Sequence, residues 1–199
     1  SGALLGSLRP LSLADAQALR DLPGVEVVVP LVQGTAAVSH HGRQRHVTVY
    51  GVSGELPALW PLQLAQGRFY AAAAPGRERA QAVLGHTLHR ELFGHAPAVG
   101  ARVRVGGEGY RVAGVLAHRG RLLGFDLDDA LFIPTGRALA LFDREGLMEI
   151  DLRYRAGLPV DRVAERVRER LIARHGQEDF SLTTQQQMLD VLGNLLDQV

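Results

Sequence analysis

Apolar residues recur at helical spacing in three stretches of the chain. The clearest covers residues 159–175, where Pro159 stands in the first turn and Gly176 follows the end. Its apolar positions share one face: Val160, Val163, Ala164, Val167, Leu171 and Ile172. This pattern predicts a helix with one buried side. A second helix is expected to begin at Ser12, because Asp15 stands in the capping-box position three residues later.

The third stretch, residues 184–199, carries six large apolar side chains at helical spacing: Met188, Leu189, Leu192, Leu195, Leu196 and Val199. Burying each of them stabilises a structure by ~1.5–3 kcal/mol. The stripe is therefore expected to dock on its own domain, to pair with a copy of itself or to continue into a further segment.

Alternating or β-branched apolar runs predict a series of short strands. The first are expected at residues 25–32, with an edge position or a bend at Pro30, and at 35–39 and 45–52, with a polar turn at 40–43. Later strands are predicted at 81–85, 102–105, 110–116, 130–133, 149–154 and 180–183, and short helices at 87–93 and 135–142.

These elements predict an α+β fold with two subdomains. An α-β-β segment, residues 1–52, and a β-α-β segment, residues 147–183, are expected to form one discontinuous α/β subdomain. The glycine-punctuated segment between them, residues 53–146, predicts a smaller inserted α/β subdomain whose first boundary lies near Ser53. Residues 184–199 are predicted to begin a stalk helix.

The composition excludes several classes of protein. The 199 residues carry a formal net charge of +1, so no overall field attracts nucleic acid. Cysteine is absent, which excludes disulfides, thiol catalysis and thiolate metal sites. No apolar run approaches the ~18 residues of a membrane span, so the chain is expected to be soluble as given. Its first residue is Ser1, which is expected of a processed chain or of an excised segment.

Two groups of polar residues are candidates for chemistry. His86 and His89 lie three apart on a predicted helix, but zinc needs a third ligand, and a surface or capping role is favoured. Asp126, Asp128 and Asp129 could do acid–base work or hold Ca²⁺, but the downstream Glu and central Gly of a calcium loop are missing. A turn that precedes a strand is favoured for these carboxylates.

The helix at 159–175 also carries five arginines: Arg162, Arg166, Arg168, Arg170 and Arg174. Glu165 and Glu169 stand at spacings that pair with Arg162, Arg166 and Arg168, so a solvated, mutually neutralised face is favoured over a phosphate site. Nucleophile-elbow and phosphate-loop motifs are absent from the sequence. We therefore predict no catalytic, cofactor-binding or metal-binding residue.

Nine residues at the ends of short apolar runs occur in a recognisable order: Gly67, Arg68, Phe69, Gly85, Phe93, Gly94, Gly100, Gly114 and Pro134. With Leu22-Pro23-Gly24-Val25 before them, this series resembles the periplasmic core domain of MacB-type ABC transporter permeases, the FtsX-like and lipoprotein-releasing group. The resemblance covers about residues 8–189. One departure lies at residues 71–76, an alanine-rich segment where the family commonly has an acidic residue.

The resemblance implies a periplasmic domain of an inner-membrane permease, with a porter-like subdomain and a smaller one inserted into it. It also implies a homodimer or a paralogous permease partner, a separate cytoplasmic ATPase domain or subunit, and a periplasmic adaptor or lipoprotein cargo. Such a domain is not an enzyme and needs no cofactor; it transmits ATP-driven motion in efflux or lipoprotein transport. Met188, Leu192, Leu195 and Val199 would then belong to the stalk.

Two alternatives remain open from the sequence. One is a stand-alone hydrolase that uses the loop containing Asp126, Asp128 and Asp129 together with a histidine. The other is a periplasmic ligand-binding module, which a small ligand would stabilise in thermal unfolding.

Overall fold

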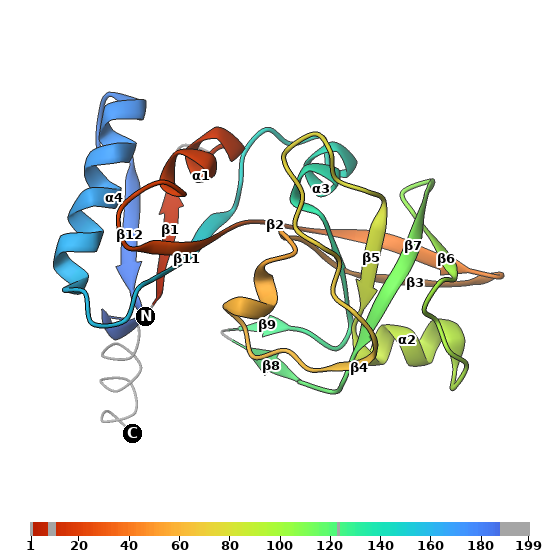
Figure 1. Ribbon diagram of the computed structural model, residues 1–199. Helices are drawn as coiled ribbons and strands as arrows, with labels where there is room; N and C mark the ends of the chain where they lie inside the picture. The colour runs from red at the N-terminus through yellow and green to blue at the C-terminus, as the bar shows by residue number, and fades with distance from the viewer. Residues whose placement is uncertain (1, 8–10, 123, 188–199) are drawn as a thin grey trace, which may run out of the picture. The chain divides into compact units, whose positions relative to one another are not determined.

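The computed structural model describes residues 2–7, 11–122 and 124–187 (Figure 1). The chain divides into two compact units: the first comprises Ser1–Pro30 and Glu145–Val199, and the second comprises Leu31–Arg144. Among the described residues, no helix is long and apolar enough to cross a membrane. The strands and helices alternate as an α+β fold, as the sequence predicts.

The first unit contains a sheet with two helices packed against each other. Its strands are β1 (Gly2–Ser7), the beginning of β2 (Val25–His40), β11 (Glu149–Tyr154) and β12 (Phe180–Thr184). They lie in the order β12-β1-β11-β2, and β1 is antiparallel to both of its neighbours. The helices are α1 (Leu13–Leu19) and α4 (Val160–His175). Strand β1 has no counterpart among the predicted strands, although it lies between two of them.

Six strands of the second unit form a closed ring. Around this ring lie β2, β3 (Arg43–Gly51), β10 (Ala130–Ile133), β5 (Gln81–Leu84), β7 (Glu108–Leu116) and β6 (Arg102–Val105), which returns to β2. The pairs β3/β10 and β5/β7 are parallel, and the other pairs of the ring are antiparallel. Because each strand in the ring has a partner on both sides, this sheet is a small closed barrel.

Smaller elements complete the second unit. Strand β4 (Leu64–Gly67) pairs with the last residues of β7, and β8 (Arg121–Leu122) pairs with β9 (Phe125–Asp126). Helices α2 (His86–Phe93) and α3 (Thr135–Leu141) both contact β3, and a short 3₁₀ helix, η1, covers Leu56–Ala58. Apolar residues of the barrel strands, such as Val49, Leu84 and Phe132, are fully buried and form the core.

Pro30 lies within strand β2. Strand β2 runs through this residue for 16 residues, and the predicted strands at 25–32 and 35–39 are its two halves. The polar turn that follows is present: His41 and Gly42 have positive φ angles of 45° and 80° and form the two-residue loop between β2 and β3. Paired positive φ angles are typical of the type I′ turn that joins twisted strands.

The boundary between the two units differs from the predicted one. It falls at Leu31, whereas the sequence predicts it near Ser53, and the second falls at Glu145 rather than at residue 147. The reason is that the later half of β2 and all of β3 pair with strands of the barrel, namely β6 and β10. Residues 31–52 therefore belong to the second unit.

Only the first residues of the predicted C-terminal helix are described. Residues 185–187 are helical, and Thr184 Oγ1 accepts a hydrogen bond from the amide of Gln187 at 3.2 Å. In return, the amide of Thr184 donates to Gln187 Oε1 at 2.9 Å, which completes a capping box. The stalk candidates Met188, Leu192, Leu195 and Val199 lie outside the described residues.

Candidate functional site

The predicted acid–base loop is built as a turn. Asp126 Oδ1 accepts hydrogen bonds from the amides of Asp128 and Asp129 at 3.0 and 3.3 Å. The carboxylate of Asp128 accepts from the amides of Arg119 and Gly120 at 2.8 and 2.9 Å, and it also pairs with His118 at 2.7 Å. These oxygens are engaged with the backbone, as expected for a turn that precedes a strand.

The third carboxylate of the loop is also engaged. Asp129 receives two hydrogen bonds from Arg45, from Nε at 2.8 Å and from Nη2 at 3.0 Å. Arg45 lies 3.8 Å from Glu91 as well, so one guanidinium joins β3, α2 and the loop. The arrangement fixes the loop in place.

The two candidate histidines do not meet at a metal site. His89 is buried on α2, and its Nε2 lies 2.8 Å from the carbonyl oxygen of Ala96. The ring of His86 instead lies against that of His118, with centroids 5.7 Å apart. Across residues 2–7, 11–122 and 124–187, no three His, Asp or Glu side chains are placed to hold a metal ion.

The arginines of α4 differ from the predicted solvated face. The pair Arg168–Glu165 is present at 2.9 Å, and Arg168 also contacts Glu178 at 3.0 Å. Three others reach the segment that contains α1: Arg166 donates to the carbonyl oxygen of Pro23, Arg170 to Ala18 and Asp21, and Arg174 to Asp15. Sequence spacing along one helix cannot show this, because the partners lie about 150 residues away.

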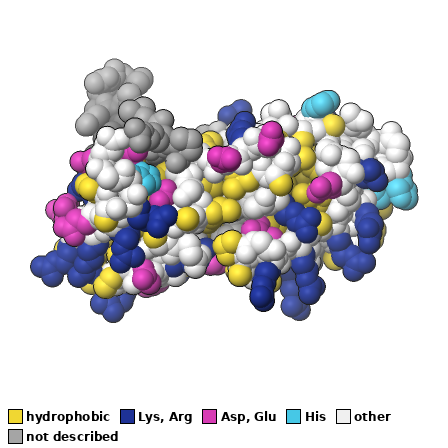
Figure 2. Space-filling model, turned by 90° about the horizontal axis from the view of Figure 1, so that it is seen from above, with side chains coloured by type: hydrophobic (Ala, Val, Ile, Leu, Met, Phe, Trp, Pro, Cys, Tyr) yellow, Lys and Arg dark blue, Asp and Glu magenta, His cyan; other side chains and the backbone are white. Residues whose placement is uncertain are grey.

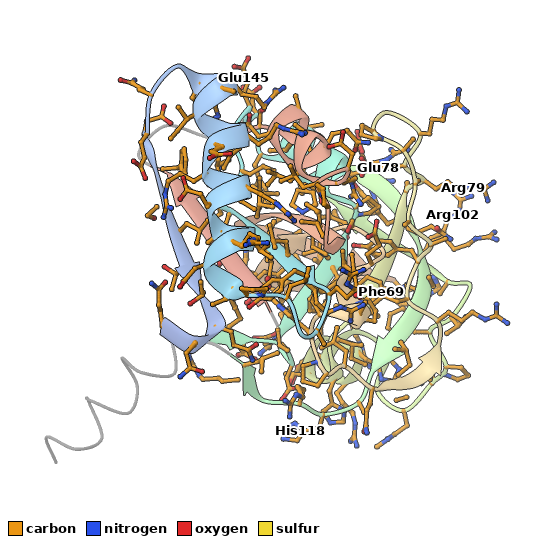
Figure 3. The ribbon with its side chains drawn as sticks, turned by 60° about the vertical axis from the view of Figure 1, so that its left-hand side comes forward. Phe69, Glu78, Arg79, Arg102, His118 and Glu145 are labelled. Carbon is orange, nitrogen blue, oxygen red and sulfur yellow. The ribbon has the colours of Figure 1, made fainter. Side chains whose placement is uncertain are left out.

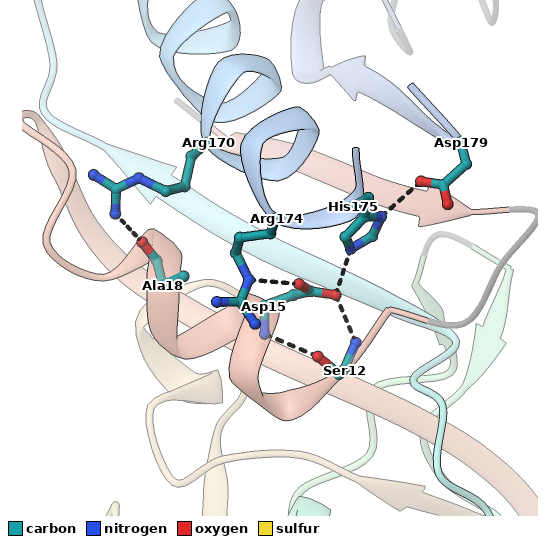
Figure 4. Close-up of polar contacts among 7 residues, drawn as sticks. All are labelled: Ser12, Asp15, Ala18, Arg170, Arg174, His175 and Asp179. Carbon is teal, nitrogen blue, oxygen red and sulfur yellow. Dashed lines mark hydrogen bonds and ion pairs between the residues drawn. The ribbon is translucent and has the colours of Figure 1, made fainter. Parts of the chain in front are cut away.

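The polar centre of the first unit is a cluster around Asp15, at the start of α1 (Figure 4). The side chain of Asp15 is only 4% exposed and accepts from Arg174 Nε and His175 Nε2, both at 2.8 Å. It also accepts from the amide of Ser12, whose hydroxyl caps the helix as the sequence predicts. His175 continues the chain of contacts to Asp179, with Nδ1 2.6 Å from Oδ1.

Protonated His175 fits this position, because both ring nitrogens then donate to carboxylates. Hydrogen bonds to Asp179 and Asp15 raise the pKa of His175 above its ordinary value, although burial opposes them. The stabilisation of the folded state by protonated His175 is complete below pH about 6.5, and it is lost as the pH rises through the raised pKa of His175. Burial also raises the pKa of Asp15, but hydrogen bonds from Arg174, Ser12 and His175 outweigh it and lower that pKa. This second contribution is lost only in acid.

A second titratable feature of the first unit is Glu149, the first residue of β11. Burial raises its pKa to about 7, and the nearby charge of Asp151 adds to the effect. Asp151 is itself buried, with 8% of its surface exposed. Sequence reasoning missed both Glu149 and the Asp15 cluster. The available signal for the cluster was the spacing of four residues between His175 and Asp179.

Several of the nine signature residues lie where two backbone segments of the protein approach each other closely. A Cβ at Gly67 would collide with the carbonyl oxygen of Ala113, and one at Gly114 with that of Arg68. A Cβ at Gly85, before α2, would collide with the carbonyl oxygens of the aspartate loop. Gly94 and Gly100 instead have positive φ angles of 63° and 88° and end turns.

The remaining signature residues have packing or capping positions. Phe69 contacts the rings of Tyr70 and Phe132, with centroids 4.6 and 6.0 Å apart, and its place in the second unit is visible in Figure 3. Phe93 stacks on His40 with centroids 4.0 Å apart. Pro134 is the N-cap residue of α3, and Arg68 is exposed while its amide donates to Ala113. The divergent residues 71–76 are exposed and contain no helix or strand.

Comparison with known proteins agrees with this fold. The family model described as the MacB-like periplasmic core domain matches residues 1–170. The chain belongs to this family. The crystal structure of the periplasmic region of MacB from Actinobacillus actinomycetemcomitans aligns with a TM-score of 0.83 at 16% identity, over 97% of this chain and 92% of that one. The extracellular domain of the ABC-type transporter YknZ from Gram-positive bacteria aligns with a TM-score of 0.78, also at 16% identity, over 92% and 100%.

Curated relatives of this MacB-like domain are longer chains that are named as ATP-binding/permease proteins. A macrolide export ATP-binding/permease protein MacB from Hyphomonas neptunium is 33% identical over 183 residues, which is 89% of this chain and 28% of the relative. The pyoverdine export ATP-binding/permease protein PvdT from Pseudomonas savastanoi is 27% identical, over 90% of this chain and 28% of the relative. The chain thus spans a little over a quarter of the length of these relatives.

Proposed function

We propose that this chain is the extracytoplasmic domain of an ABC transporter permease, and that it transmits ATP-driven motion to a partner or cargo outside the inner membrane. The match of the family model over residues 1–170 carries this proposal. It is supported by relatives that are named as macrolide and pyoverdine exporters with an ATP-binding part. The domain itself has a structural role, and ATP hydrolysis belongs to another domain or subunit.

The partners in this proposal are a second permease copy or a paralogue, the ATPase, and a periplasmic adaptor or a lipoprotein cargo. The turn that contains Asp126, Asp128 and Asp129 supports a non-enzymatic role, because its carboxylates are engaged with amides, His118 and Arg45. Met188, Leu192, Leu195 and Val199 remain the stalk candidates. The parent gene should then encode an apolar span of about 20 residues on each side of this segment.

The test uses the full-length parent transporter in a strain that lacks its own exporters. Replacing residues 31–144 by a short Gly-Ser linker removes the second unit while β1, β11 and β12 remain paired in the first. We expect export of a macrolide to be lost while ATP hydrolysis by the purified transporter continues. As a control, Glu169→Gln changes one exposed side chain of α4 and should leave both activities unchanged.

Unchanged export by the transporter without residues 31–144 would contradict the proposal. A parent gene with no apolar span on either side of the segment would contradict it as well. Loss of ATP hydrolysis together with export would show instead that the domain is needed for assembly of the transporter.

A further inference from the structure

Charge is divided unevenly between the two units. Residues 31–144 contain 13 of the 22 arginines and eight of the 21 acidic residues, a net charge of +5. The remaining residues carry a net charge of −4, so the total of +1 conceals the difference. In Figure 2, dark-blue arginine side chains are visible on both units, and those of the second unit lie along its lower edge. A basic surface of this kind attracts anionic partners.

Four exposed arginines lie together on the outside of the barrel: Arg79, Arg102, Arg104 and Arg111. We call this set the arginine face. In β6, exposed and buried residues alternate, so Arg102 and Arg104 point outward while Val103 and Val105 enter the core. Arg111 of β7 stands directly opposite Arg102 in the antiparallel register.

The backbone also brings Arg79 to this face. The amide of Arg111 donates to the carbonyl oxygen of Ala80 at 2.9 Å, and Arg79 is the preceding residue. Figure 3 shows the side chains of Arg79 and Arg102 extending into solvent on the same side of the unit. Gly109 of β7 stands opposite Arg104, and Nη1 of Arg102 lies 3.9 Å from the position that a Cβ of Gly109 would take.

The arginine face has little internal neutralisation. Among the described residues, the side chains of Arg79, Arg102 and Arg111 form no ion pair. The nearby carboxylate of Glu78 is held by the amide of Gly136, and exposed Glu108 stands opposite Val105 at the end of the hairpin. Like charges directly opposite each other on neighbouring strands are destabilising, so a bound anion would relieve this repulsion between Arg102 and Arg111.

We propose that the arginine face binds an acidic, extended segment of a partner protein. Guanidinium groups bind carboxylates through two parallel hydrogen bonds. Arg104 is held on the face by a separate hydrogen bond of 2.6 Å, which its Nη2 donates to the carbonyl oxygen of Gly107. Residues two apart on a strand, such as Arg102 and Arg104, are ~6.6 Å apart, which is also the spacing of alternate side chains in an extended peptide. Acidic residues at alternate positions therefore match the face in charge and in spacing.

An anionic membrane surface fits less well. Peripheral binding to a bilayer commonly combines basic residues with apolar side chains that enter it. The large apolar side chains that are exposed among the described residues are Val99 and Met148, and neither belongs to the arginine face. We therefore choose the protein segment, and lipid binding becomes one outcome of the test.

This inference deepens the partner contact in the proposed function, but its test is independent of transport. The 199-residue chain is titrated, by fluorescence anisotropy, into a labelled peptide of about 12 residues in which Glu alternates with Ser, and into the same peptide with Gln. We expect binding of the Glu peptide only, weakened about tenfold between ~50 and ~300 mM NaCl. Arg102→Gln with Arg111→Gln should weaken binding at least about tenfold.

The matched control removes the same charge elsewhere. Arg155→Gln with Arg162→Gln changes two exposed arginines of the first unit and should alter affinity less than about twofold. Arg102→Lys with Arg111→Lys keeps the charge, and an intermediate affinity is expected because the paired hydrogen bonds are lost. Thermal unfolding of each variant, followed by circular dichroism, establishes that it is folded.

Three results would overturn the inference. The first is no binding of the Glu peptide, and the second is equal weakening by the two glutamine double variants. The third is binding to phosphatidylglycerol vesicles, but not to the peptide, that depends on Arg102 and Arg111, which would identify a lipid surface. A failed peptide titration beside a normal transport result would leave the proposed function standing.

Discussion

At the scale of single residues, Asp15 combines a local role with a long-range one. It closes the capping box with Ser12, and it also receives Arg174 and His175 from the end of α4. A carboxylate that is 4% exposed needs these partners, because a buried charge without them is costly. The same side chain therefore begins α1 and holds it against α4.

Asp15→Asn tests this double role. The neutral amide of Asn cannot form ion pairs with Arg174 and His175. The variant should therefore lose about 2 kcal/mol of the free energy of unfolding at pH ~6. Urea unfolding followed by circular dichroism measures the change. Glu169→Gln, at an exposed position on α4, serves as the control and should alter stability by less than about 0.5 kcal/mol. Equal stability of the two variants would argue against the cluster.

The titration of Glu149 predicts that stability depends on pH. Its pKa is raised from 4.5 to about 7 by burial and by Asp151, so the folded state favours the protonated form. The contribution of protonated Glu149 to the free energy of unfolding is complete below pH about 4.5, and it is lost as the pH rises through about 7. Glu149→Gln should therefore match the parent chain near pH 4.5 and exceed its stability by roughly 1–3 kcal/mol at pH 8.

The measurement for Glu149 is urea unfolding at several pH values between these limits. Glu145→Gln changes an exposed carboxylate of the same unit and is the matched control. A gain for Glu149→Gln that is the same at pH 4.5 and at pH 8 would show that titration is not its cause. The raised pKa of His175 also lowers the stability of the folded chain as the pH rises. A loss of stability at high pH that Glu149→Gln and Glu145→Gln share is therefore assigned to His175.

At the scale of elements, β4 and β7 approach each other unusually closely. The pairing carries an irregularity between Leu64 and Gln66, and the backbone of Arg68 lies over Gly114. Only a residue without a Cβ fits there. The Gly-Arg-Phe segment at residues 67–69 and the glycine at 114 are thus two sides of one contact.

Gly114→Ala should disrupt this contact. The new Cβ would collide with the carbonyl oxygen of Arg68, and we expect a loss of about 1–3 kcal/mol, as for other overpacked sites. Gly109→Ala is the matched control, because on the same strand its Cβ would meet nothing nearer than Arg102 Nη1 at 3.9 Å. Thermal unfolding of both variants measures the difference, and equal unfolding temperatures would contradict the prediction.

At the scale of the whole molecule, the closed ring of β2, β3, β10, β5, β7 and β6 gives the second unit a core of its own. Its pairings from Val32 to Gly51 involve the same residues that the sequence assigns to the other subdomain. The ring explains why the boundary lies at Leu31, since a barrel that lacked β2 and β3 would be open.

Residues 31–144 should therefore fold as an isolated fragment. We expect cooperative thermal unfolding by circular dichroism and a dispersed amide spectrum by NMR. The fragment 53–144, which starts at the boundary predicted from sequence, lacks two strands of the ring and should be unfolded or aggregated. Folding of 53–144 with the same cooperativity would show that the ring is not the stabilising unit.

Features that depend on neighbours within a few residues were predictable from the sequence. These are the capping box at Ser12, the helix at 159–175, the turn at His41 and Gly42, and the alternation along β6. The order of the signature residues also identified the family, which the family model confirms. Local chemistry decides each of these, so local pattern is enough to predict it.

Which elements pack and pair with each other is visible only in the folded structure. Alternation shows which side of a strand is buried but not which strand pairs with it, so the ring, the boundary at Leu31 and strand β1 were not predicted. The partners of Asp15, 159 and 160 residues away, are hidden from sequence spacing for the same reason. The arginine face likewise exists only because the register places Arg102 opposite Arg111.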